Sequence, residues 1–291
     1  MSAETGIILA IIAMLSWGIG DFLIQRSTRA IGNWETLFVI TAFGAIVLLP
    51  FVWSDLPTLF DNAGSLLFAL TFSGAIIFIA ALLEFEALRR GKLSVVEPIW
   101  SLEIPAAAIL AYVVLDEVLS VWQIVLIAIL IVGLVFVSFR GGKIRARHFL
   151  EKGVLISIVA AMMMGAANFF MGFSGRITDT LVANFIACLF MAIVTIIYIA
   201  AKGRTKKMIA DIKANSRMLV LMSIFDNAAW VAFVAAMALA PIGIVVALTE
   251  SYIIIVVLLG LMVNKERLKH RQKVGLIIAL CAAITLAIIS G

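Results

Sequence analysis

Long apolar stretches separated by short polar segments make up nearly the whole chain. Each stretch is about 20 residues long, which is the length that an α-helix needs to cross ~30 Å of hydrocarbon. The pattern therefore predicts an all-α integral membrane protein with ten transmembrane helices. Their expected positions are roughly residues 5–25, 35–53, 64–88, 93–115, 121–139, 153–173, 180–201, 218–240, 242–263 and 273–290.

The composition excludes an ordinary soluble domain. Of the 291 residues, 64% are hydrophobic and 13% are charged, whereas soluble domains are about half apolar and about a quarter charged. Cys188 and Cys281 lie inside apolar stretches and are interpreted as small hydrophobic residues. The sequence contains no metal-ligand spacing, glycine-rich phosphate loop or nucleophile motif. We therefore expect neither an enzyme nor a bound metal or other cofactor.

The distribution of basic residues predicts an orientation. If ten helices alternate in direction, all but one of the 22 lysines and arginines fall in the loops of a single face, called here the basic face. The opposite face, called the termini face, carries both chain ends and receives only Arg176. The positive-inside rule places the basic face in the cytoplasm. Both termini are then expected outside the cell (plasma or inner) membrane.

The chain also contains an internal repeat. Residues 115–123 (LDEVLSVWQ) and 264–272 (NKERLKHRQ) share the motif E-x-L-x-x-x-Q at an offset of 149 positions. WGIGDF from residue 17 resembles MGAANFF from residue 164 at an offset of 147. The predicted organisation is a five-helix repeat at 1–140, a basic linker at 141–152 and a second five-helix repeat at 153–291. Five is an odd number, so the second repeat is inverted, as in many secondary transporters.

Several of these features together resemble a known family. The pair Trp17–Gly18 near the end of the first helix, Pro105 in the fourth helix and the repeated E-x-L-x-x-x-Q motif are similar to the EamA branch of the drug/metabolite transporter superfamily. The resemblance spans nearly the whole chain. It implies secondary transport of small metabolites, often the export of amino acids or related compounds. The chain departs from the family at Asp21, where uncharged residues are usual, and in the predicted placement of its termini, which family members keep in the cytoplasm.

Carboxylates inside predicted helices are candidate functional groups, because an ionisable side chain at mid-membrane costs about 2.5–3.5 kcal/mol on insertion scales. Glu103, Glu250 and Asp226 lie near the middle of their helices, where there is no lysine or arginine. We expect them to meet a cationic ligand, a proton, water or neighbouring polar side chains. Asp21 lies closer to the basic face, where Arg26 is an alternative partner.

Two prolines are expected to break the fourth helix. Pro98 and Pro105 lack an N–H, so the carbonyls of Ser94 and Ser101 have no helical partner. Broken backbone at membrane depth is tolerated where it packs against protein or lines water. Glu97 lies directly before Pro98 in this broken segment and is included in the candidate site. The alternative is a kinked helix whose glutamates form hydrogen bonds with neighbouring helices.

The repeat pairs these residues with the second half of the chain. An offset of 149 relates Ser101 to Glu250 and Glu103 to Tyr252. A carboxylate of one half is then expected to face a polar partner in the other half, across a pseudo-two-fold axis.

Aromatic and amide side chains complete the candidate site. Trp100 and Trp230 share helices with Glu103 and Asp226, and their rings suit an organic cation through cation–π contact. Asn168 is a neutral candidate in the sixth helix.

These features predict a secondary active transporter that works by alternating access, with Glu250 and Glu103 as its central carboxylates and Asp226 in support. The family resemblance implies export. The expected substrate is a small polar metabolite such as an amino acid or organic amine. The expected partners are this small molecule and membrane lipid, with protons as the candidate coupling ion and no nucleic acid. The protein is expected to be a monomer or a homodimer. Two alternatives stay open: an ion or water channel, and an accessory membrane protein without transport of its own.

Overall fold

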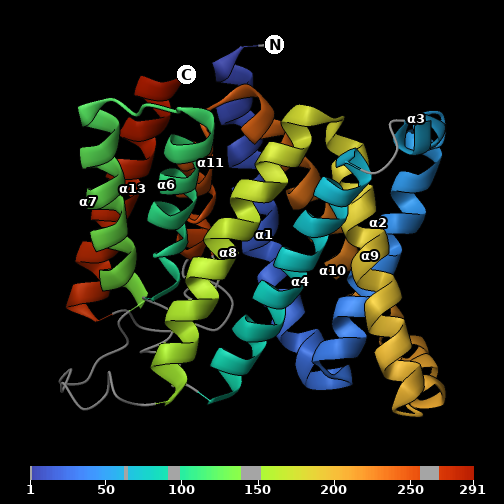
Figure 1. Ribbon diagram of the computed structural model, residues 1–291. Coiled ribbons are helices and arrows are strands. Elements are labelled where there is room, and N and C mark those ends of the chain that lie inside the picture. Colours follow the sequence, from blue (N-terminus) through green and yellow to red (C-terminus); the bar gives the residue numbers. More distant parts are fainter. Residues whose placement is uncertain (1, 62–64, 91–98, 139–151, 256–268) are drawn as a thin grey trace.

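The computed structural model describes residues 2–61, 65–90, 99–138, 152–255 and 269–291. Within these ranges every regular element is a helix (Figure 1). The first half contains α1 (Ala3–Ile31), α2 (Asn33–Val52), the short α3 (Leu56–Asp61), α4 (Ser65–Arg90), α6 (Glu103–Leu115) and α7 (Val121–Ser138). The second half contains α8 (Lys152–Ile177), α9 (Thr180–Ala201), α10 (Thr205–Leu239), α11 (Ile242–Thr249) and α13 (His270–Ser290).

Each of the ten predicted stretches overlaps one of these helices. Seven helices, α1, α2, α4, α8, α9, α10 and α13, are long and apolar enough to cross a membrane. The described parts of α6, α7 and α11 belong to shorter apolar helices. The prediction of an all-helical, multi-pass membrane protein is therefore confirmed, while the count of ten spans stays a prediction.

Helix packing follows a pseudo-two-fold pattern. α1 packs along α10, and α8, which is the counterpart of α1, packs along α4. α2 packs on its own counterpart α9, and α7 packs on its counterpart α13. Exchanging the two halves therefore reproduces the same set of neighbours. In Figure 1, α1 runs downward from the N-terminus whereas α8 runs upward, so the two halves run in opposite directions and both termini lie on one face.

The glutamines of the repeated motif explain why α7 and α13 pair. The Gln123 side chain accepts a hydrogen bond from the Ser120 N–H (2.8 Å) and so caps α7, while its amide donates to the Ser290 hydroxyl at the end of α13 (3.2 Å). Gln272 caps α13 in the same way, by accepting from the Lys269 N–H (3.1 Å), and donates to the Val137 carbonyl at the end of α7 (3.0 Å). Each glutamine thus starts its own helix and ties it to the end of the other.

We expect replacement of Gln272 by leucine to destabilise the protein more than the same change at Gln123. Gln272 is buried, and its loss leaves the Val137 carbonyl and Lys269 N–H without these partners, which costs about 1–3 kcal/mol for each buried group. Gln123 lies closer to the surface, where water can replace it. The measurement is the melting temperature of the two purified variants in detergent. An equal or larger loss for Gln123→Leu would contradict this account of the motif.

Candidate functional site

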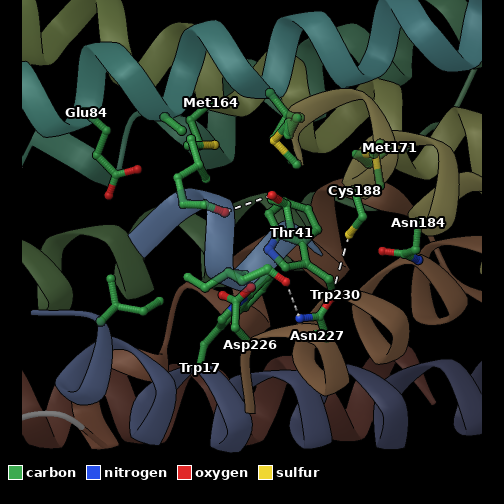
Figure 2. Close-up of a pocket in the computed structure, with 17 residues that line it drawn as sticks. Trp17, Thr41, Glu84, Met164, Met171, Asn184, Cys188, Asp226, Asn227 and Trp230 are labelled. Atoms are coloured by element: carbon green, nitrogen blue, oxygen red, sulfur yellow. Dashed lines mark hydrogen bonds between the residues drawn. The ribbon is translucent and has the colours of Figure 1, made fainter. Parts of the chain in front are cut away.

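A cavity of about 180 Å³ lies between the two halves of the chain (Figure 2). Its walls come from three helices of the first half, α1, α2 and α4, and from their counterparts α8, α9 and α10. Asp226, Asn227 and Trp230 lie on α10, and in the view of Figure 2 Glu84 and Met164 lie across the cavity from Asp226.

The cavity surrounds the pseudo-two-fold axis, because repeat-related residues line it together. At an offset of 147 the lining contains the pairs Trp17 and Met164, Ile24 and Met171, Leu37 and Asn184, and Thr41 and Cys188. At an offset of 149 it contains the pairs Ile77 and Asp226, and Ala81 and Trp230. A central site between repeats is where secondary transporters with inverted repeats bind their substrates.

The two halves supply different chemistry at equivalent places. Asp226 and Asn184 of the second half correspond to the apolar Ile77 and Leu37 of the first. Of the described residues that line the cavity, Asp226 and Glu84 are acidic, and none is lysine, arginine or histidine. When they are ionised, these carboxylates can contribute favourably to the binding of a ligand that carries a positive charge.

Asn227 is held in a fixed orientation at the cavity wall. Its Nδ2 donates to the Ile40 carbonyl of α2 (3.1 Å) and to the Ser223 carbonyl of its own helix (2.9 Å), and its Oδ1 accepts from the Cys188 thiol (3.6 Å). A Cβ atom at Gly44 would collide with this Oδ1. The glycine therefore makes room for the amide, which joins α10 to both α2 and α9 beside Asp226.

Aromatic rings form a second part of the wall. Trp17 and Trp230 meet edge to face with ring centroids 5.2 Å apart, and Trp17 packs in the same manner on Phe233 at 4.9 Å. Such edge-to-face contacts fix the ring orientations. An apolar or cationic group in the cavity would meet rigid indole surfaces.

Of the predicted site residues, Asp226 and Trp230 line this cavity and the others lie elsewhere or outside the described side chains. Glu103 and Asn168 meet each other between α6 and α8, where the Asn168 amide donates to a Glu103 carboxylate oxygen (3.3 Å). Both are buried. A Cβ atom at Gly165 would lie 2.7 Å from the Glu103 carbonyl oxygen, so the two helices are in close contact here.

Ser101 and Glu250 lie at equivalent interruptions of two helices. Residues 101–102 form a turn before α6, and residues 250–251 form a turn after α11, at an offset of 149. Pro105 accounts for the first interruption because it has no N–H to donate to the Ser101 carbonyl. The Ser101 hydroxyl is buried, and no hydrogen-bond partner for it occurs in the described part of the chain.

The remaining predicted residues are placed as follows. Trp100 is buried against Ala160 and Ala161 of α8. Tyr252 is partly buried after the turn that follows α11. Asp21 belongs to α1, but its side chain is not described, and Glu97 lies outside the described residues.

Sequence reasoning did not select several residues of the cavity, among them Thr41, Asn184 and Cys188. Cys188 was interpreted as a small hydrophobic residue, but it lines the cavity and donates to Asn227. The repeat offered a signal that could have found it, since Thr41 and Cys188 are related by the same offset as Trp17 and Met164.

Comparison with known proteins identifies the family. A family model described as the EamA-like transporter family matches residues 4–139 and again residues 151–288. The chain belongs to the EamA-like transporter family. The resemblance seen in the sequence is thereby confirmed, and the family model matches the chain in two segments. The exact bounds of the two predicted repeats stay a prediction.

The fold recurs in solved structures. One of them, described as "Crystal structure of protein", superposes with a TM-score of 0.76 and 14% sequence identity, over 98% of this EamA-like chain and 97% of the other. At this identity the similarity concerns the fold alone. A search of curated proteins found no match.

Proposed function

We propose that this EamA-like protein is a secondary active transporter that binds a small organic amine or amino acid in the axial cavity and moves it by alternating access. The observation that carries the proposal is the placement of Asp226, a buried carboxylate, in a cavity lined by repeat-related residues. A site on the axis between inverted halves can be opened to either side by equivalent motions.

The cavity supports a substrate with one cationic group and a compact body. Its volume of about 180 Å³ is below the roughly 300–1,000 Å³ of pockets for drug-sized ligands. Asp226 supplies a counter-charge, the amides of Asn184 and Asn227 supply hydrogen-bonding groups, and Trp17 and Trp230 supply surfaces for an apolar or cationic part.

Proton coupling is part of the proposal. A carboxylate that binds an ammonium group in one state can bind a proton in another, so substrate and proton would compete for Asp226. Glu103 and Glu250 are buried near the paired helix interruptions and serve as the second acidic site. Their separation from the cavity suits residues that sense the proton without contacting the substrate. Export is the direction implied by the family resemblance.

We further propose ten membrane spans in two inverted repeats, 1–140 and 153–291, in the cell membrane. Every basic residue of the chain except Arg176 falls on the basic face under this topology, which supports a cytoplasmic basic face and external termini. A monomer or a homodimer is compatible with the proposal.

Cys188 offers a direct test of the cavity. In a Cys281→Ser background, a cationic methanethiosulfonate reagent is expected to modify Cys188 slowly, because the thiol is buried. A substrate at ten times its Kd should slow this reaction further, by about tenfold, because it occupies the site. Amines, amino acids, sugars and organic acids are compared at two pH values. Protection by sugars or organic acids but not by amines or amino acids would contradict the proposed substrate class.

A channel is the principal alternative. Its flux would rise without saturation as solute concentration increases, and it would move no protons in exchange. Measurement of solute flux and internal pH in proteoliposomes separates the two functions. An accessory membrane protein without transport would show neither flux nor ligand protection of Cys188.

A further inference from the structure

An ion pair joins the two halves of the chain at the termini face. Arg176, near the end of α8, contacts Glu117 in the turn between α6 and α7, with Nη1 and Oε1 2.5 Å apart. The two side chains are 25% and 14% exposed. In Figure 1, the end of α8 and the segment between α6 and α7 lie on the same side as both termini.

Both members of the pair also bind helix ends. Arg176 donates through Nε to the Met237 carbonyl (2.7 Å) and through Nη2 to the Ala240 carbonyl (3.0 Å), at the end of α10. Glu117 accepts from the N–H of Ile242, the first residue of α11 (2.8 Å). A cation at a helix C-terminus and an anion at a helix N-terminus both complement the helix dipoles. Glu117 precedes α7 in the sequence, but its carboxylate caps the first turn of α11.

The helix that carries Arg176 also lines the cavity. Met171 lines the cavity, and Arg176 lies five residues further along α8, a rise of about 7.5 Å. Between them, a Cβ atom at Gly172 would lie 2.8 Å from the Met237 sulfur and 3.1 Å from the Ile242 side chain. α8 is therefore packed directly against α10 and α11 on this side.

A second contact holds the same end of α8 to the first half. The hydroxyls of Ser73 on α4 and Ser174 on α8 are 2.8 Å apart. The last turns of α8 are thus joined to the first half at Ser73 and at Glu117. An opening toward the termini face that moves this end of α8 would have to break both contacts.

We propose that the Arg176–Glu117 ion pair is the latch that keeps the cavity closed at the termini face. The latch stabilises the conformation closed on this side, and its loss shifts the population toward a conformation open on this side. This inference rests on the transport function proposed above, because it describes what keeps the same cavity closed to one side of the membrane during alternating access.

The basic face contains a matched ion pair for comparison. Arg204, in the turn before α10, contacts Glu35 at the start of α2, with Nη2 and Oε1 2.7 Å apart. This pair also joins the second half to the first, and the Glu35 side chain is 2% exposed. It lies at the other end of the molecule, so its loss should not open the termini face.

The test measures how fast a membrane-impermeant cationic methanethiosulfonate reagent reaches Cys188 from each side of the membrane. The full-length protein with Cys281→Ser is used in cells and in inverted vesicles. In that background, labelling of Ser2→Cys identifies the side of the membrane on which the termini face lies, and labelling of Lys202→Cys identifies the side of the basic face. Arg176→Met should raise the labelling rate from the termini face about tenfold, the effect of a shift of about 1.4 kcal/mol. Glu117→Gln should raise it less, because its amide oxygen can still accept from Ile242.

Arg204→Met is the control, and it should leave the rate from the termini face unchanged. The latch is rejected if Arg176→Met leaves that rate unchanged in protein that is monodisperse on size exclusion. It is also rejected if Arg176→Met and Arg204→Met raise the rate equally from both sides, because that result indicates general loosening. Labelling of Cys188 needs no substrate, so this test does not depend on the transport function. A failure of the proposed transport function would instead show as absent protection of Cys188 by ligands. The two failures are therefore distinguishable.

Discussion

Replacing Asp226 with asparagine is expected to weaken binding of the cationic substrate about 100-fold and to abolish concentrative uptake in proteoliposomes. Removal of one partner of a buried charge pair costs about 2–5 kcal/mol, and about 2.7 kcal/mol corresponds to 100-fold in Kd. Asparagine has nearly the same shape as aspartate, so the packing of α10 against α1 should survive. The measurements are ligand affinity by thermal shift and initial uptake rate.

Asp211→Asn is the matched control for this experiment. Asp211 lies on the same helix, α10, but toward the basic face and not at the cavity. Its replacement should leave affinity and uptake within about twofold of the unaltered protein, as expected for a surface substitution away from special contacts. If Asp226→Asn retains both affinity and uptake, Asp226 is not the counter-charge and the proposed site is wrong.

Gly44→Ala is expected to give the largest loss of stability among single methyl additions near the cavity. The new Cβ atom would collide with the Asn227 Oδ1 and lie 2.8 Å from the Cys188 sulfur. Overpacking typically costs about 1–3 kcal/mol, and displacement of the Asn227 amide also removes its bonds to the Ile40 and Ser223 carbonyls. The melting temperature in detergent should fall by several degrees.

A double substitution separates the steric effect from a general intolerance at Gly44. Asn227→Gly removes the obstacle, so Gly44→Ala should cost clearly less stability in that background than in the unaltered protein. This is a double-mutant cycle between residues in contact. Equal costs in the two backgrounds would show that Asn227 is not what requires a glycine at position 44.

The candidate site was only partly predictable. Carboxylates at membrane depth and the prolines of the fourth helix directed attention to Glu103 and Glu250, and the structure places both of them outside the cavity. The same reasoning selects Asp226, and Trp230 is selected as an aromatic residue on the same helix. Both line the cavity. Burial alone could not distinguish these cases, because all three acidic residues are buried to the same degree, each with 7% exposure.

The repeat held more information about the site than the acidic residues did. The Trp17–Met164 relation was visible in the sequence, and the same offset leads to Thr41 and Cys188, which also line the cavity. The polar partners of Asn227 could not be found in this way. The carbonyl of Ile40, for example, is a backbone group whose exposure depends on how α2 meets α10.

The sequence by itself determined the helical membrane class, the positions of most helices, the internal repeat and the family. Twenty-residue apolar stretches allow no other regular structure in a bilayer, since every backbone polar group must be satisfied within the membrane. The tertiary structure decided which helix faces meet and therefore where the cavity lies. Helices that are apolar on every side have no periodic signal for their rotation, and so the partners of Glu117, Arg176 and Asn227 emerged only from packing.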